Sequence, residues 1–179
     1  ILNKFIFTNK IKHYFNPTNF SIVLALLFLP GVWVSPGLWG HEYFLILMVF
    51  ILGILVTYLA NRLSLVLAFL TIFISLRFAR LTWLGDPLAI LIHSLENGSF
   101  FIFVFFMLSD PKTSPSSQKA MWLFVFMVNL FTYYFEFFKF MKSAVFYGLF
   151  TTSFVFMLYD LIVNLWRKNE KKYTVTVPS

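Results

Sequence analysis

Long apolar stretches joined by short polar links make up most of this chain of 179 residues. A helix that crosses a bilayer needs about 20 predominantly apolar residues. Hydrophobic residues account for 60% of the sequence and charged residues for 12%, whereas a typical soluble domain carries about 25% charged residues. Too few polar side chains remain to cover a water-facing surface. The sequence therefore predicts an all-α integral membrane protein, a single polytopic domain in contact with the lipid bilayer.

About six transmembrane or half-membrane segments are expected, and the first and the fourth are interrupted. Their expected bounds are Phe20–Val34, Tyr43–Ala60, Leu63–Phe78, Pro87–Leu108, Met121–Phe138 and Ala144–Trp166. Polar basic flanks at residues 1–14 and 167–179 enclose them. Basic residues at membrane ends suit the cytoplasmic side and anionic lipid headgroups. The net charge of +7 is therefore explained without nucleic acid as a partner.

The two interrupted segments begin alike. Each opens on a capping residue followed by proline, at Asn16-Pro17 and at Asp86-Pro87, which suits the start of a helix. The first is broken at Pro30-Gly31 and the fourth at Glu96-Asn97-Gly98. Interrupted hydrophobic segments indicate a binding site in transporter-like folds, because irregular backbone at membrane depth is tolerated only inside protein or beside a water-filled cavity.

Each interruption also has a simpler interpretation. Pro30-Gly31 could end an ordinary helix, with Trp33 and Trp39 anchored in the membrane interface. The polar step at residues 96–98 could be a loop between two short segments. Both interpretations stay open at this point.

Charge does not settle the orientation of the later loops. Six crossings place both basic termini on the cytoplasmic side, but Arg77 and Arg80 then fall outside, against the usual bias. A re-entrant fourth segment would move the C-terminus across the membrane. Glu136 and Lys139, three residues apart near the end of a span, are expected to form an interfacial ion pair.

One group of candidate site residues lies at the break in the fourth segment. His93 and Glu96 are three residues apart and share one face of a helix. They could be a buried hydrogen-bonded pair that stabilises the broken helix. Alternatively, with Asn97 and Ser99, they could hold a proton or a cation or contact a bound ring, since ionisable groups in apolar sequence are functional candidates. Gly98 would let a ligand approach the backbone closely.

A second group lies at segment ends. Asp110 ends an apolar run and Pro111 blocks its continuation, which is a structural role. With Lys112 and Thr113, Asp110 could instead offer a carboxylate and donors to a flavin ring, a phosphate or a cation. The stretch from Asn16 to Asn19 is expected to cap a helix, whose N-terminus could face an anion or a ring carbonyl.

Several kinds of chemistry are excluded or not expected. The chain has no cysteine, so disulfides, thiolate metal sites and iron–sulfur clusters are excluded. Its three histidines, at 13, 41 and 93, lack the spacing of a helical metal site, and no metal is expected. Neither a nucleophile with its base nor a phosphate-binding glycine loop is present. Catalytic side chains are therefore not expected, and electron transfer would need a cofactor.

Three stretches, taken in order, point to a family. They read HYFNPTNF at residues 13–20, VWVSPGLWG at 32–40 and FFMLSDPKTSP at 105–115, and WLGDPLA at 83–89 fits the same pattern. The chain resembles the membrane D subunit of Rnf-type electron-transport complexes, which is related to the B subunit of the sodium-pumping NADH:quinone oxidoreductase. The resemblance implies a fold of two inverted repeats, similar to urea channels, in the bacterial cytoplasmic membrane. Six segments would form one repeat, so the chain, which starts at Ile1, is expected to be the C-terminal part of a longer protein.

The resemblance also implies a function. The chain would be a subunit of a larger membrane complex that supports flavin-based electron transfer, coupled to cation transport. The family attaches one flavin to threonine in a Gly-Ala-Thr context, which this chain lacks, so FMN or riboflavin would be bound non-covalently. The candidate contacts are Asn16, Asn19, His93, Glu96, Asn97, Gly98, Ser99, Asp110, Lys112 and Thr113. Two alternatives are a non-enzymatic scaffold subunit and, by analogy of fold alone, a small-solute or ion channel.

Overall fold

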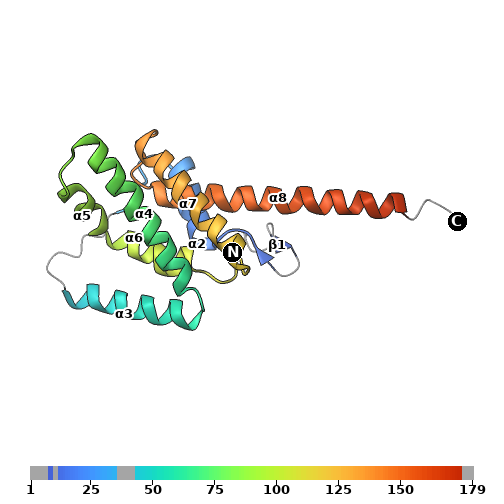
Figure 1. The fold of residues 1–179 in the computed structure, drawn as a ribbon, viewed down its shortest axis with the longest axis horizontal. Helices are drawn as coiled ribbons and strands as arrows, with labels where there is room; N and C mark the ends of the chain where they lie inside the picture. The colour runs from blue at the N-terminus through green and yellow to red at the C-terminus, as the bar shows by residue number, and fades with distance from the viewer. Residues whose placement is uncertain (1–7, 10–11, 36–42, 175–179) are drawn as a thin grey trace.

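The computed structural model describes residues 8–9, 12–35 and 43–174, and these are almost entirely helical (Figure 1). The helices are α2 (Pro17–Phe28), α3 (Tyr43–Leu59), α4 (Leu63–Leu84), α5 (Ala89–Leu95), α6 (Gly98–Ile102), the π-helix η1 (Phe103–Leu108), α7 (Gln118–Phe137) and α8 (Ala144–Thr174). Strands β1 (Thr8–Asn9) and β2 (Lys12–His13) pair antiparallel. The predicted anchor Trp39 and most of the N-terminal basic flank lie outside the described residues.

Three helices, α4, α7 and residues 144–167 of α8, are long and apolar enough to cross a membrane. A fourth span is present if α5 and the α6–η1 helix count as one, bent by 56°. The prediction of an all-α membrane protein is thus confirmed to the level of three or four candidate spans. Helix α2 and residues 47–59 of α3 are apolar but shorter. The count of six segments and the likeness to an inverted repeat stay predictions.

Helix α2 begins and ends for reasons that the sequence contains. Asn16 caps it, because the side-chain Oδ1 accepts hydrogen bonds from the backbone N–H groups of Thr18 and Asn19, both at 3.1 Å. Pro17 occupies the first turn, where a missing N–H costs nothing. The helix stops at Phe28, before Pro30-Gly31. The interpretation of that pair as a helix end is therefore confirmed, and so is the cap.

The expected bounds of the other segments needed correction. Helix α4 runs past Phe78 to Leu84 and ends at Gly85, whose φ of 74° is a left-handed conformation that glycine adopts without steric cost. The predicted Asp86-Pro87 cap is wrong, since α5 starts at Ala89 without a side-chain cap. Helix α8 continues through the basic flank to Thr174, so residues 167–174 are helical.

The fourth segment is broken where its polar step predicts. Helix α5 ends at Leu95 and α6 begins at Gly98. The Oδ1 atom of Asn97 accepts a hydrogen bond from Phe100 N–H at 3.2 Å, which caps the new helix. The chain then continues into the six-residue π-helix η1, and π-helical turns occur often near functional sites.

The core lies where α4, η1, α7 and α8 meet. Its fully buried side chains include Leu65, Phe69, Phe103, Val125 and Val128. Helices α7 and α8 approach closely at Gly148, where an added Cβ would lie 2.9 Å from the Val128 carbonyl oxygen. The second half of α8 extends beyond the bundle, and α3 lies along its edge (Figure 1).

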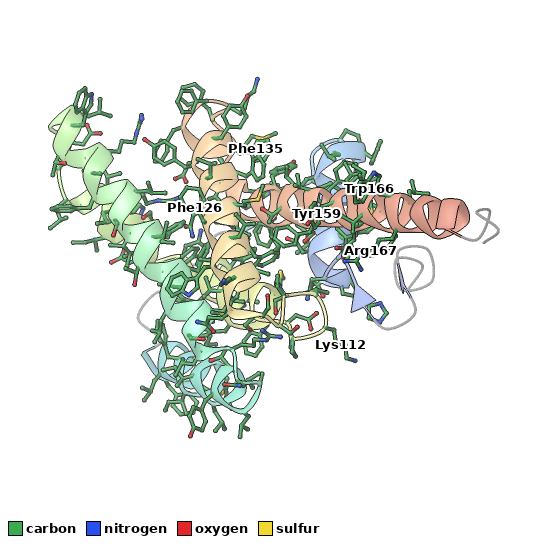
Figure 2. The ribbon with its side chains drawn as sticks, turned by 45° about the vertical axis from the view of Figure 1, so that its right-hand side comes forward. Lys112, Phe126, Phe135, Tyr159, Trp166 and Arg167 are labelled. Carbon is green, nitrogen blue, oxygen red and sulfur yellow. The ribbon has the colours of Figure 1, made fainter. Side chains whose placement is uncertain are left out.

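Apolar side chains also cover much of the outside. Figure 2 labels exposed aromatic residues on two helices, among them Phe126 on α7 and Tyr159 and Trp166 on α8. Phe124, on the other face of α7, is buried in the core. The aromatic α7 therefore both packs inward and presents apolar rings outward, which suits contact with lipid.

Candidate functional site

The predicted site residues divide into two groups along the bundle. Asn16, Asp110, Lys112 and Thr113 lie where α4 begins, whereas residues 93–99 lie toward its other end. Helix α4 connects the two places, since Arg62 hydrogen-bonds to the loop after Asp110 and the side chain of Arg77 lies near Asn97. Fifteen helical residues separate these arginines by about 22 Å along the axis. No single site among the described residues therefore contains both groups.

The Asp110 group is joined by hydrogen bonds. The side-chain amide of Asn16 donates to Asp110 Oδ2 at 3.1 Å, and the other carboxylate oxygen accepts from Lys112 N–H at 3.0 Å. The Asp110 carbonyl accepts from the Ser114 hydroxyl at 2.8 Å and from the Thr113 hydroxyl at 3.4 Å. These bonds hold the loop that follows η1, while the Lys112 side chain is exposed.

Two further contacts fix this end of the bundle. Arg62 donates to the Pro115 carbonyl at 2.7 Å, which ties the start of α4 to the loop. Asn19 is 2% exposed and donates to the Phe146 carbonyl at 3.3 Å, and no described group pairs with its Oδ1. Asn19 thus links α2 to α8 in the interior rather than lying beside Asp110.

The pair of His93 and Glu96 forms, but at the surface. His93 Nδ1 lies 3.2 Å from Glu96 Oε2, and the two side chains are 76% and 60% exposed. The expectation of a buried pair is therefore wrong. Asn97 and Ser99 instead turn toward a cavity, and the Ser99 hydroxyl donates to the Ser35 carbonyl at 2.8 Å.

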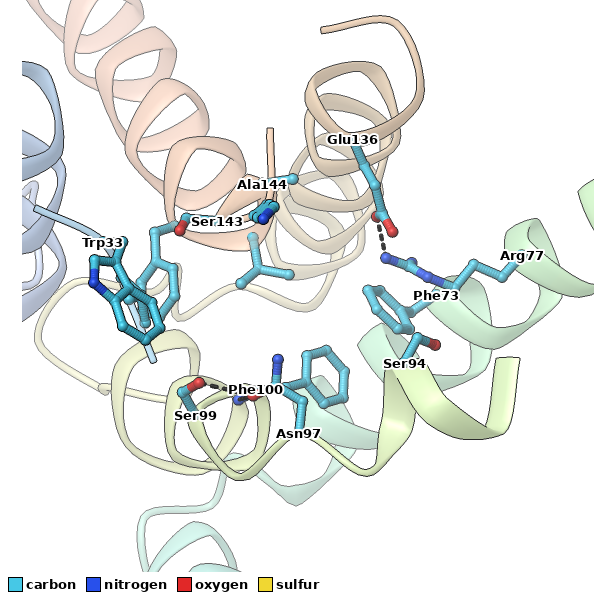
Figure 3. A pocket seen from close by; sticks show the side chains of 14 residues that line it. Trp33, Phe73, Arg77, Ser94, Asn97, Ser99, Phe100, Glu136, Ser143 and Ala144 are labelled. Carbon is cyan, nitrogen blue, oxygen red and sulfur yellow. Dashed lines mark hydrogen bonds and ion pairs between the residues drawn. The ribbon is translucent and has the colours of Figure 1, made fainter. Parts of the chain in front are cut away.

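That cavity has a volume of about 250 Å³ and lies between the break and the start of α8 (Figure 3). It is lined by Trp33, Val34, Phe73, Arg77, Ser94, Asn97, Ser99, Phe100, Glu136, Lys142, Ser143, Ala144, Val145 and Phe146. Sites that enclose a drug-sized ligand usually measure about 300–1,000 Å³. The cavity is thus suited to a small ligand or to part of a larger one.

The charged centre of the cavity wall is an ion pair between two helices. Arg77 on α4 donates from Nη2 to Glu136 Oε2 on α7, and Arg77 is only 8% exposed. Its guanidinium lies 3.4 Å from the centre of the Phe73 ring, a close cation–π contact. The expected pairing of Glu136 with Lys139 is wrong. Arg77 thus lies within an apolar helix and has a carboxylate of the protein as its partner.

A smaller cavity of about 70 Å³ is lined by the same ion pair. Arg80 and Asp86 line it together with Arg77 and Glu136. The Arg80 guanidinium stacks on the Phe137 ring at 4.1 Å. Charges of both signs therefore surround Glu136 at this end of the bundle, which is unusual for apolar helices.

Sequence reasoning missed Arg77, Trp33, Lys142 and Ser143 as cavity residues. The signal that could have found the first was present: an arginine inside a long apolar stretch needs a partner. The others required knowledge of which loops meet. Among the described residues, no group of three His, Asp or Glu side chains could hold a metal ion.

Comparison with known proteins identifies no relative of this chain. No protein-family model, curated protein or solved structure matches the chain. The chemistry of the two ends of the bundle therefore carries the functional argument.

Proposed function

We propose that the chain is a membrane subunit of a larger complex, similar to the Rnf D subunit, that supports flavin-based electron transfer coupled to cation transport. The flavin is FMN or riboflavin, bound non-covalently at the Asp110 end and shared with a neighbouring subunit. The complex lies in the bacterial cytoplasmic membrane.

Contacts between the stretches that carry the family resemblance are the main support. Asn16, from the first stretch, hydrogen-bonds to Asp110, from the third, at 3.1 Å. Ser35, from the second, accepts a hydrogen bond from Ser99 on α6. The first and third stretches thus meet, as expected of parts of one fold, and the second contacts the break in the fourth segment.

The size and the place of the cavities support a shared flavin. Both described cavities flank Arg77, and the larger has about 250 Å³, below the usual size for enclosing a ligand of flavin size. A flavin near Asp110 would therefore lie against the surface of this chain, with Lys112 exposed to meet its ring or phosphate. A second subunit would cover the other face of the ring.

The cation role rests on the break in the fourth segment. Glu96 lies beside a helix interruption, and its carboxylate is 60% exposed. An accessible carboxylate at a break within an apolar segment is a candidate cation or proton position. In this proposal the Glu96 carboxylate binds the cation. The neighbouring group is His93, whose Nδ1 lies 3.2 Å from Glu96 Oε2.

The flavin part is tested by Lys112→Gln, with Lys119→Gln as a matched control on another exposed lysine. Each variant is purified with its partners in mild detergent, and the flavin released per mole of chain is measured. We expect Lys112→Gln to lower the flavin content and Lys119→Gln to leave it unchanged. A wild-type complex without releasable flavin would remove the redox function.

A scaffold subunit without redox function is the second candidate. The hydrogen bonds around Asp110 favour it, because both carboxylate oxygens and the carbonyl already have protein partners. Under this alternative Glu96→Gln would leave the activity of the complex intact, while removal of a whole helix would abolish assembly. Loss of activity in Glu96→Gln with assembly preserved would exclude it.

A further inference from the structure

The cavity at the helix break contains hydrogen-bond donors that the protein does not use. The Nη2 atom of Arg77 donates a hydrogen bond to Glu136. No hydrogen bond of its Nη1 or Nε atoms is present among the described residues. Its side chain is 9% exposed, and buried polar groups normally have partners. Because Phe73 stacks on the face of the guanidinium, the edge is left for a ligand in the cavity (Figure 3).

Asn97 supplies a second unused donor. Its Oδ1 accepts a hydrogen bond from Phe100 N–H at 3.2 Å and lies 2.7 Å from the Ser99 hydroxyl oxygen, whose single hydrogen is shared between Asn97 and the Ser35 carbonyl. A backbone N–H can only donate, so the atom that faces it must be the amide oxygen. The Nδ2 group of Asn97, with its two hydrogens, therefore lies on the other side, without a partner in the described part of the chain.

The loop before α8 supplies the third. Lys142 is exposed and lines the cavity, and it forms no ion pair with any described residue. Ser143, beside it, also lines the cavity. Arg77 and Lys142 outnumber Glu136, so the lining carries one net positive charge. An anion is favoured over a cation.

We propose that this cavity binds the phosphate group of an anionic amphiphile, held by Arg77, Asn97 and Lys142. The edge of a guanidinium matches phosphate geometry through paired hydrogen bonds. The three donors come from α4, from the start of α6 and from the loop before α8. The tetrahedral phosphate directs its oxygens out of a single plane, so donors from three different elements can reach it at once.

The place of the cavity suits an amphiphile. Glu136 stands one residue before the end of α7, and α8 begins at Ala144. The cavity therefore lies at an end of two candidate spans, and the ends of membrane spans are where lipid headgroups lie. Trp33, 72% exposed at its edge, offers an apolar ring with a polar N–H to the rest of the molecule.

The test uses native mass spectrometry of the full chain. Samples come from nanodiscs of phosphatidylcholine alone, of phosphatidylcholine with phosphatidylglycerol, and of phosphatidylcholine with added inorganic phosphate. Asn97→Asp keeps the oxygen that caps α6 and replaces the donor by a charge that repels phosphate. Lys142→Gln removes the loop cation, and Lys139→Gln makes the same charge change at a residue that lines neither cavity.

We expect the wild-type chain to retain a phosphate-bearing adduct, and Asn97→Asp and Lys142→Gln each to weaken it about tenfold or more, as loss of a hydrogen bond to a charged group does. Lys139→Gln should bind as the wild type does. Retention of phosphatidylglycerol alone identifies a membrane lipid, and retention of inorganic phosphate as well identifies a soluble phosphate compound. Equal retention by the wild type and all three variants, or no adduct in any sample, would overturn the proposal.

Because Lys142 is exposed in a loop, its substitution leaves the fold intact even if Asn97→Asp does not. If Asn97→Asp does not fold, retention of the phosphate adduct by Lys142→Gln decides whether the proposal stands. Lys112→Gln is carried through both experiments, and loss of flavin from its complex with the phosphate adduct of its chain retained separates the two proposals.

Discussion

The side-chain amide of Asn16, in front of α2, donates a hydrogen bond to the carboxylate of Asp110, which follows η1, at 3.1 Å. The same Asn16 caps α2 through its oxygen. One side chain thus starts a helix and ties it to a loop 94 residues later in the sequence.

Loss of the Asn16 side chain should remove two stabilising interactions, the cap of α2 and the hydrogen bond to Asp110. We expect Asn16→Ala to lower the free energy of unfolding by about 2 kcal/mol, since a lost cap costs about 1 kcal/mol and a lost bond to a charged group a similar amount or more. Asn16→Asp keeps the cap but sets two carboxylates against each other. Equilibrium unfolding in mixed micelles measures both.

An exchange of the two side chains supplies the control. In the double variant Asn16→Asp with Asp110→Asn, the new amide at position 110 can donate to the new carboxylate at position 16. The double variant should therefore lose less stability than Asn16→Asp and Asp110→Asn together, and this deviation from additivity is the coupling energy. Strictly additive effects would show that the contact contributes nothing.

The ion pair between Arg77 and Glu136 should be costly to break from one side. Glu136→Ala leaves a buried guanidinium without its counter-charge, and we expect a loss of about 3 kcal/mol in unfolding free energy, at the low end for buried pairs because Glu136 is partly exposed. Arg77→Met combined with Glu136→Leu should lose much less. Lys139→Ala should change stability by less than about 0.5 kcal/mol. If Lys139→Ala destabilised the protein as much as Glu136→Ala, the partner of Glu136 would be Lys139 and not Arg77.

Two glycines test close helix contacts with different neighbours. At Gly148 an added Cβ would meet the Thr132 hydroxyl and the Val128 carbonyl oxygen, at 2.9 Å from the latter, and this backbone cannot move away. At Gly53 it would meet the Phe105 ring at 2.5 Å, and this ring is buried, so it would have to shift within the core. We expect Gly148→Ala and Gly53→Ala each to destabilise by about 1–3 kcal/mol. Thermal unfolding of the two variants measures both losses, and an unchanged midpoint for Gly148→Ala would contradict the close α7–α8 contact.

The surface pair of His93 and Glu96 should matter little for folding. Both side chains are more than half exposed, and such pairs contribute about 0–1 kcal/mol. Glu96→Gln should therefore leave the unfolding midpoint almost unchanged, which keeps any change in the activity of the complex interpretable. A large drop in that midpoint would mean that Glu96 is structural.

Local patterns in the sequence predicted local structure well. Asn16-Pro17 predicted a cap and a helix start, and Glu96-Asn97-Gly98 predicted a break, because capping and helix breaking depend on a few neighbouring residues. The Asp86-Pro87 pair follows the same pattern and failed. There the glycine before it ends α4, and the chain makes a turn before α5 begins.

Long-range contacts were beyond the sequence. Nearness in the sequence predicts that Glu136 pairs with Lys139. Its partner in the structure is Arg77, which lies 59 residues away on another helix. The bonds of Asp110 and the cavity of Arg77 likewise depend on how helices cross, which periodicity in nearly uniform apolar stretches does not reveal. Nine of the ten candidate residues therefore lie at two separate ends of the bundle, and Asn19 lies in the interior between α2 and α8.

The central claim is that this chain belongs to a membrane complex that carries flavin. The most direct measurement is the absorption spectrum of the unboiled complex purified from its own membrane in mild detergent, together with the identity of the proteins that accompany it. We predict a yellow complex with flavin released on denaturation and at least one redox partner. A colourless complex without releasable flavin, whose partners have no redox cofactor, would contradict the account.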